Sequence, residues 1–238
     1  MRLLVPLVLG LLLLSAVATV SAQTPEATPA GPTAADVCAP NAGTPEATAA
    51  APIDVTTIPF DVVLIDALLP STKSSIDLAT VIRERSAHPP MVEFVDLVIE
   101  VNQDWQTRLM AIRQADAADV PVLGDQDIAL GMEMHMSATP GRGGASGLEG
   151  ITTAHRTASL SSLCTAEVDP DLIYIDAMVG QFSAMLIVTG LAVVDASNPE
   201  LQALAVEMQD EINAEIDQLN LWRQTWYPDA PFTDEHGE

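Results

Sequence analysis

Residues 60–69 read Phe-Asp-Val-Val-Leu-Ile-Asp-Ala-Leu-Leu, and 110 positions later residues 170–179 read Pro-Asp-Leu-Ile-Tyr-Ile-Asp-Ala-Met-Val. The same offset relates residues 61–121 to residues 171–231 without a gap, and ten of these 61 paired positions are identical. Ten identities alone are few, but Pro89 and Pro199, Pro121 and Pro231, and many apolar positions also stay in register. The sequence therefore predicts a duplicated structural unit.

Each copy has the pattern of a helical hairpin. In the second copy, Asn198-Pro199-Glu200 is a helix start signal, and the apolar residues after it recur every three or four positions. Few strand signals compete with this pattern. Because two hairpins supply four helices, we predict an all-α fold in which the hairpins form a four-helix bundle or a stacked pair.

The rest of the chain separates into segments by composition. An apolar run follows Arg2 and ends at the small residues Ser21-Ala22, which is typical of a secretory signal peptide; an uncleaved membrane anchor is the alternative. Ala, Thr and Pro dominate the next segment, as in a disordered stalk. The predicted boundaries are 1–22 for the signal peptide, 23–53 for the stalk, 54–120 for the first hairpin, 121–169 for a Met- and Gly-rich linker with a short helix over 148–163, 170–230 for the second hairpin, and 231–238 for an acidic tail.

The apolar first helix of the second copy needs a separate interpretation. Residues 172–194 carry one charge, Asp176, and are long enough to cross a membrane. However, Asp176 and Gln181 are costly in lipid, and the helix that follows is amphipathic. We therefore interpret residues 172–194 as a buried helix of the bundle.

The charge balance limits the partners of this protein. A formal net charge of −24 repels nucleic acid, and no basic patch offsets it. The carboxylates can attract cations, but their scatter is more typical of a surface that keeps an exported protein soluble. We expect a secreted, periplasmic or cell-surface protein that meets a membrane only through an uncleaved signal segment. We expect a protein partner at the cell surface or in the periplasm, whose identity the sequence does not give, and a homo-oligomer is compatible with the sequence.

The chain has two cysteines, Cys38 in the predicted stalk and Cys164 before the second copy. In an exported protein, two cysteines most simply form one disulfide. Metal ligation by the pair is the alternative, but neither residue has a second Cys within ligand spacing.

Three motifs resemble a known family. They are Phe60-Asp61-x-x-x-Ile65-Asp66-x-x-x-Pro70, Glu200-Leu201-x-Ala203-Leu204-Ala205 and Ala214-Glu215-Ile216-x-x-Leu219-x-x-Trp222-Arg223. Over residues 58–116 and 168–227 the chain resembles the exported bacterial family called domain of unknown function 305. This resemblance implies a ferritin-like, all-helical fold in tandem copies and a link to metal handling, copper in particular.

The family's hallmark, Asp-x-Met-Ile-Pro-His-His, is missing from both copies. Ser71 and Thr72 stand where the first copy would carry the His pair, and Gln181 and Phe182 stand there in the second. Neither Thr nor Phe replaces imidazole as a ligand for a soft metal. The metal site that the resemblance implies is therefore not carried over to these positions.

One metal candidate remains, comprising Met132, Met134, His135 and Met136. Thioether and imidazole groups suit Cu(I), and we predict a flexible, Gly-flanked loop that wraps the ion. The alternative is a segment that packs on the bundle. Copper is the one cofactor that the sequence suggests.

Asp66 and Asp176 occupy matching positions and invite interpretation as a carboxylate pair. A ferritin-like di-metal site needs Glu-x-x-His pairs, which neither hairpin contains, so we interpret each Asp as structural. No nucleophile elbow, phosphate loop or metalloprotease motif is present, and we expect no enzyme. The first hypothesis is an exported, non-catalytic helical scaffold or interaction protein. The alternative is a copper-binding protein that uses the Met132–Met136 loop.

Overall fold

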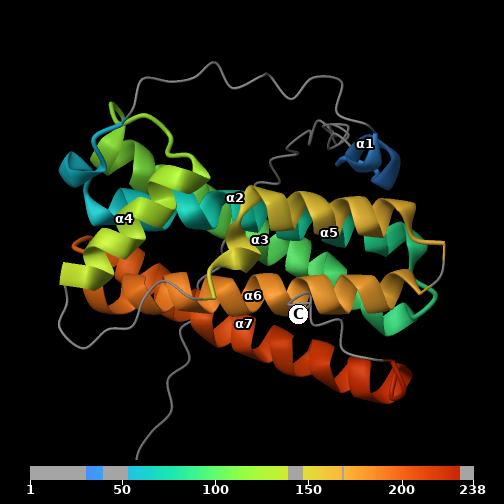
Figure 1. Cartoon of the computed structure of the whole chain (residues 1–238). Coiled ribbons are helices and arrows are strands. Elements are labelled where there is room, and N and C mark those ends of the chain that lie inside the picture. Colours follow the sequence, from blue (N-terminus) through green and yellow to red (C-terminus); the bar gives the residue numbers. More distant parts are fainter. Residues whose placement is uncertain (1–30, 40–52, 139–146, 168, 231–238) are drawn as a thin grey trace, which may run out of the picture. The chain divides into compact units, whose positions relative to one another are not determined.

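The structure is a computed structural model of the chain, and it describes residues 31–39, 53–138, 147–167 and 169–230. From Pro32 onward the chain forms one compact unit. The predicted signal peptide and acidic tail lie outside the described residues. In chain order the elements are α1 (Ala34–Cys38), the 3-10 turn η1 (Val55–Thr57), α2 (Phe60–Arg85), α3 (Pro89–Ala117), α4 (Asp125–Ala138), the 3-10 turn η2 (Glu149–Ile151), α5 (Thr153–Thr165), α6 (Pro170–Asp195) and α7 (Pro199–Trp226) (Figure 1).

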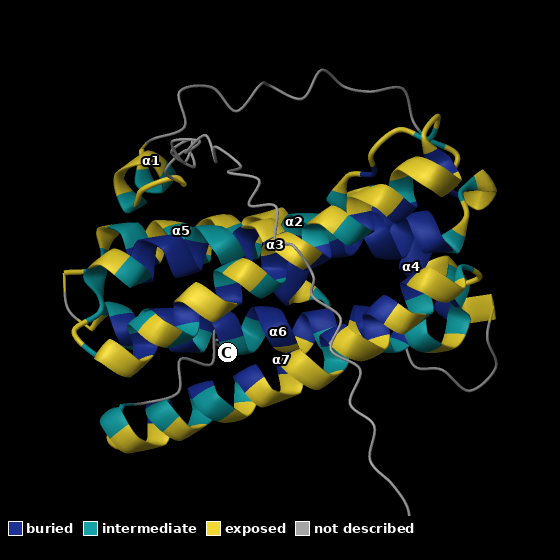
Figure 2. Ribbon diagram, turned by 180° about the vertical axis from the view of Figure 1, so that it is seen from behind, coloured by how far each residue is buried: buried dark blue, intermediate teal, exposed yellow. Residues whose placement is uncertain are grey.

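The four long helices form the predicted all-α bundle. Three-residue turns join α2 to α3 and α6 to α7, so each copy is an antiparallel hairpin, and α2 also packs on α6 while α3 packs on α7. The inward faces of these helices are buried and the outward faces exposed (Figure 2). The predicted stripe on α7 supplies Leu201, Leu204, Met208, Ile212 and Leu219 to this core, all fully buried.

The two hairpins are related by an approximate twofold axis, because each contacts the other in the same way. Asp61 in the first turn of α2 accepts hydrogen bonds from the backbone N–H groups of Ser197 (2.9 Å) and Asn198 (2.8 Å), in the turn between α6 and α7. Asp171, its equivalent in α6, lies 2.8 Å from Nδ1 of His88, in the turn between α2 and α3. The start of each copy therefore anchors the turn of the other, and α2 and α6 run antiparallel.

The segment between the copies differs from the prediction. The described part of residues 121–169 contains two helices where one was predicted, since α4 precedes α5, and α5 begins at Thr153 after the turn η2. Both helices pack on α2, while η2 and α5 also cover part of α6. Gly150 makes this packing close: a Cβ at this position would lie 2.6 Å from the carbonyl oxygen of Gly180.

Part of the predicted stalk is also ordered. Cys38, at the end of α1, forms a disulfide with Cys164 of α5, which is the pairing that the sequence predicts. The backbone N–H of Ala34 donates to the Glu84 carboxylate (3.0 Å), and the Arg85 guanidinium donates to the carbonyls of Leu163 and Ala166. The prediction of a disordered stalk over 23–53 is therefore wrong for residues 34–38, because the disulfide holds them against α2 and α5.

Among the described residues, α6 is the one helix long and apolar enough to cross a membrane by length and composition. Its most apolar 18-residue window has a mean hydropathy of 2.0, and half of that window is buried. Because α6 packs on α2, α5 and α7, its composition is that expected of a bundle's central helix.

Candidate metal centre

The four positions that the sequence resemblance aligns with two His pairs are buried in the bundle, and two of them, Ser71 and Gln181, are in contact. Ser71, Thr72 and Phe182 are fully buried, and Gln181 is 1% exposed. Nε2 of Gln181 donates to the Ser71 carbonyl (3.0 Å) and to Oγ of Ser75 (2.6 Å), which joins α6 to α2. Ser71 and Gln181 are equivalent in the two copies, so this contact lies at the approximate twofold axis.

This central layer does not fit a soft metal. Oγ of Ser71 donates to the Ala67 carbonyl (3.1 Å), and Oγ1 of Thr72 donates to the Leu69 carbonyl (2.8 Å). The polar groups that meet here are hydroxyls, an amide and backbone carbonyls, and Oε1 of Gln181 is buried without a hydrogen-bond partner. None of these oxygen and amide groups is a ligand that a soft metal prefers. The layer supports helix packing rather than metal binding.

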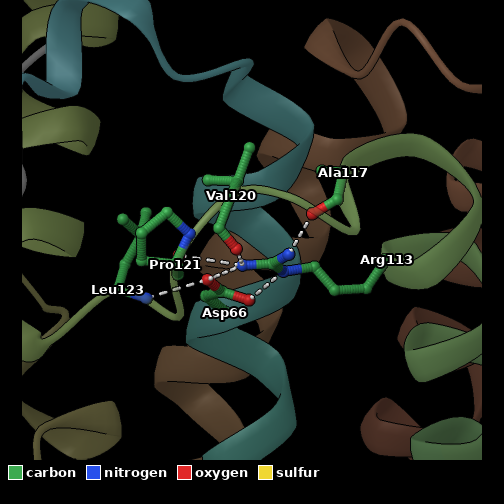
Figure 3. A network of polar contacts seen from close by, with 6 residues as sticks. All are labelled: Asp66, Arg113, Ala117, Val120, Pro121 and Leu123. Carbon is green, nitrogen blue, oxygen red and sulfur yellow. Dashed lines mark hydrogen bonds and ion pairs between the residues drawn. The ribbon is translucent and has the colours of Figure 1, made fainter.

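Asp66 forms a buried ion pair rather than part of a metal site (Figure 3). Its carboxylate accepts from Nε (2.8 Å) and Nη2 (3.1 Å) of Arg113 and from the backbone N–H of Leu123 (3.0 Å). Nη2 of Arg113 also donates to the carbonyls of Val120 and Pro121, both at 3.0 Å. The pair therefore fastens the chain that leaves α3 onto α2.

The second copy repeats this arrangement. Nε of Arg223 donates to Oδ1 of Asp176 at 2.6 Å, and its Nη1 donates to the carbonyl of Ala230 (3.4 Å), which is equivalent to Val120. Asp66 and Asp176 thus bind separate arginines, as their structural interpretation predicts. Arg113 and Arg223 are identical at the 110-residue offset, but the sequence alone does not connect them with the two aspartates.

The Met-rich segment is helical, so the prediction of a flexible loop over Met132–Met136 is wrong. Asp125 and Asp127 lie in the first turn of α4, where carboxylates stabilise the helix dipole. Ile128, Met132 and Met136 recur at four-residue spacing and are buried. Gly131 is a contact rather than a hinge, because a Cβ there would lie 2.9 Å from Cγ2 of Val63. This apolar spacing was the signal that the sequence offered for a helix.

The helix divides the four candidate donors between two faces. Met132, His135 and Met136 stand at positions i, i+3 and i+4 and therefore share a face, whereas Met134 lies on the other side. Met132 and Met136 are 0% and 6% exposed, while Met134 is 39% exposed. The four side chains therefore cannot surround a single ion.

His135 lies where α4 meets the start of α2 and the end of α6. Its ring stacks on Phe60, with centroids 3.6 Å apart and an interplanar angle of 4°. Its Nε2 lies 3.3 Å from Oδ2 of Asp195, and 28% of the His135 side chain is exposed. A half-buried imidazole beside a carboxylate and on the same helix face as two thioethers is a donor set that suits a soft cation.

No group of three or more His, Cys, Asp or Glu side chains converges on one point in the part of the chain that the structure describes. The Met132, His135 and Met136 face is thus the candidate that the donor chemistry supports, and it depends on thioethers rather than on carboxylates.

A second buried group escaped the analysis of the sequence. Glu215 of α7 is 5% exposed, and burial, followed by the charge of Glu211, raises its pKa to about 8. Tyr174 of α6 is fully buried, and burial followed by the Glu215 charge raises its pKa well above the ordinary value. In the first copy Leu64 and Trp105 occupy the equivalent positions. Because these two residues are apolar, comparison of the copies gave no sign that Tyr174 and Glu215 form a buried polar group.

Comparison with known proteins relates the fold to two solved structures. No protein-family model matches the chain, and no curated protein matches it significantly. "CopM in the Cu(I)-bound form" is 18% identical with a TM-score of 0.51, and the match covers 70% of this chain and 97% of that one. "CopM in the Cu(II)-bound form" is 19% identical with a TM-score of 0.53 and the same coverage. At this identity the likeness concerns the fold, so the chain shares its helical architecture with two copper-bound structures.

Proposed function

We propose that this is an exported, non-catalytic protein that binds copper through the face of α4 formed by Met132, His135 and Met136. The observation that carries the proposal is the half-buried His135 on the same helix face as two thioethers, in a fold shared with copper-bound structures. Thioether and imidazole ligands favour Cu(I) over hard cations.

Each residue has a distinct role in this proposal. His135 is the donor nearest the surface and the point of entry for the ion. Met132 and Met136 supply sulfur from the buried side of the helix. Asp195 orients the imidazole, as carboxylates do beside many metal-binding histidines.

The test is a Cu(I) titration of residues 23–238 against a competing chelator. The site variant is Met132→Leu/His135→Phe/Met136→Leu, which keeps the core volume and the ring on Phe60 while it removes the donors. Met134→Leu is the matched control on the opposite face. Binding that is lost in the site variant and kept in the control supports the proposal; equal binding in both, or none in the wild type, overturns it.

A scaffold or interaction role is the second candidate function. The hydrogen bonds from Gln181 to Ser71 and Ser75 favour it. At the positions that the resemblance aligns with His pairs, they join α6 to α2 and leave no imidazole ligand. A protein without Cu(I) affinity that recovers a specific partner from the cell surface would fit this role.

We also propose membership of the domain of unknown function 305 family, with two degenerate copies. The matching Asp61 and Asp171 contacts and the matching Asp–Arg pairs support a tandem duplication. The apolar run after Arg2 and the Cys38–Cys164 disulfide support export.

A further inference from the structure

The 110-residue offset relates the residues at one end of the bundle to those at the other end, but the side chains at the two ends differ in size. At the end formed by the start of α2, the end of α3 and the turn after α6, a cleft of about 530 Å³ opens to solvent. The residues that line it include the apolar Val62 and Ile65 and the residues Asp61, Asp116, Ala117 and Asn198. A volume of this size is in the range of small-molecule sites.

The opposite end holds aromatic rings at the equivalent positions. The 110-residue offset relates Asp116 to Trp226, Ala117 to Tyr227 and Asn198 to His88. The His88 ring stacks on Trp226, with centroids 4.1 Å apart and an interplanar angle of 5°. The cleft is therefore lined by short side chains at three positions. At the opposite end, the equivalent positions carry an indole, a phenol and an imidazole.

The walls of the cleft also indicate a charge preference. Asp61 is 6% exposed and is held by Ser197 and Asn198, and the exposed Asp116 accepts a hydrogen bond from the Asn198 side chain. The one lining cation, Arg113, is paired with Asp66. Two carboxylates therefore line the cleft, and the whole chain has a net charge of −24. The electrostatic potential in the cleft thus favours cations.

The second end shows which chemistry such a carboxylate can hold. There Asp171, the equivalent of Asp61, lies 2.8 Å from an imidazole nitrogen that belongs to a stacked ring. At the first end Asp61 already accepts hydrogen bonds from Ser197 and Asn198, so the carboxylate open to a ligand is that of the exposed Asp116. A flat ring in the cleft, with a basic nitrogen directed at Asp116, would combine a ring and a carboxylate contact as the second end does. We propose that the cleft between α2, α3 and the α6–α7 turn binds a small heteroaromatic cation.

The experiment is a titration of the mature chain with tryptamine, followed through the methyl resonances of Val62 and Ile65 by NMR. Indole-3-acetate, which has the same ring and the opposite charge, is the matched ligand. Tryptamine is expected to shift both methyl groups in a saturable way, with indole-3-acetate weaker. Absence of these shifts, or equal binding of the two ligands, overturns the proposal.

Two variants localise the binding. Asp116→Trp restores the second end's residue and is expected to fill the cleft and weaken tryptamine binding at least tenfold; Gln114→Trp, at an exposed position of the same helix, is its control. Asp116→Asn is expected to lower tryptamine affinity by roughly two- to fivefold, the size of an exposed charge interaction. Wild-type affinity in Asp116→Trp would exclude the cleft. Because Phe60 and Asp195, which contact His135, are close in sequence to the cleft residues Asp61 and Ser197, the titration is done without copper, and Cu(I) affinity is measured separately in the same variants.

Discussion

Asp66 and Asp176 each bind an arginine 47 positions further along the chain, and the pairs occupy equivalent places in the two hairpins. A buried ion pair is a weak source of net stability when intact, but it is damaging when one partner is removed. Here each ion pair fixes how the two helices of a hairpin align. Each guanidinium group belongs to the second helix and contacts the first helix and the chain that leaves the second helix. Both hairpins therefore have a structural ion pair at these equivalent positions.

Replacement of Arg113 by Ala tests this fastening. Because the variant leaves Asp66 buried and unpaired, we expect the free energy of unfolding to fall by about 3–5 kcal/mol. Urea denaturation followed by circular dichroism measures the change. Arg108→Ala, which breaks an exposed pair with Glu207, is the control and should cost at most about 1 kcal/mol. Equal losses in the two variants would contradict the structural role of Arg113.

Glu215 makes stability depend on pH. Burial raises its pKa from 4.5 to about 8, so between these values the folded chain holds a proton that the unfolded chain has lost. Stability should therefore decrease from pH 4.5 to 8, at a slope from this group of up to about 1.4 kcal/mol per pH unit, and level off above pH 8.

The variant Glu215→Gln removes this titration. We expect it to be more stable than the wild type at pH 8.5 by about 2–4 kcal/mol and nearly equal to it at pH 4.5. Denaturant unfolding at both pH values gives the comparison. Asp210→Asn, at an exposed position of α7, changes the charge equally and should show little of this pH dependence. A difference between Glu215→Gln and wild type that does not vary with pH would refute the assignment.

At the scale of the element, α4 shows how packing changes the meaning of a motif. Glycines beside three methionines suggested a loop, yet Gly131 allows the helix to lie against Val63, and Met132 and Met136 complete its buried stripe. Met is a good helix former, so the local propensity agrees with the tertiary contact. His135 owes its position to this helix and not to loop flexibility.

A single added methyl group distinguishes the two views of this segment. In a loop or an exposed helix, Gly131→Ala would be neutral or stabilising by up to about 1 kcal/mol. Against Val63 we expect a net loss of about 1–2 kcal/mol, because the new Cβ overlaps the Val63 side chain. Thermal and urea unfolding measure it.

A control and a coupled variant support this experiment. Gly124→Ala should change stability by less than about 0.5 kcal/mol, since its Cβ would meet only Asp127 at 3.8 Å. The loss in Gly131→Ala should shrink when Val63→Ala is also present, because the overlapping methyl groups are gone. Additive effects of the two substitutions would rule out the proposed contact.

At the scale of the whole molecule, the disulfide joins residues 126 positions apart and holds α1, which buries none of its own residues. Its stabilising effect should therefore come mainly from constraint of the unfolded chain. We expect Cys38→Ser/Cys164→Ser to lower the free energy of unfolding by about 2–4 kcal/mol, with the helical circular dichroism signal kept. The reduced wild type should match the variant. Loss of helix on reduction would show that α1 is needed to build the bundle.

The approximate twofold symmetry also explains where the molecule is asymmetric. The copies match in their Asp–turn contacts and their Asp–Arg pairs, and they differ where Trp226 and Tyr227 of the second copy correspond to Asp116 and Ala117 of the first. The intervening segment adds a further difference, because α4 packs on α2, α5 packs on both α2 and α6, and α6 keeps exposed apolar residues such as Val194. The candidate metal face and the cleft both result from departures from the duplication.

Local periodicity was sufficient to predict the duplicated pattern, the helical hairpins, the bundle and the place of α6 as a helix of that bundle. These features depend on apolar spacing and on turn signals, which a chain carries within a few neighbouring residues. The disulfide was also predictable, because an exported chain with two cysteines has a single internal pairing.

The sites were decided by the tertiary structure. Asp66 pairs with Arg113, His135 lies beside Asp195, and a cleft forms beside Asp116 only when helices distant in sequence pack together. The sequence identified these residue types without their neighbours, and it assigned Met132–Met136 to a loop. The physical reason is that helix formation follows the spacing of nearby side chains, whereas a site depends on distances between faces that only packing brings together.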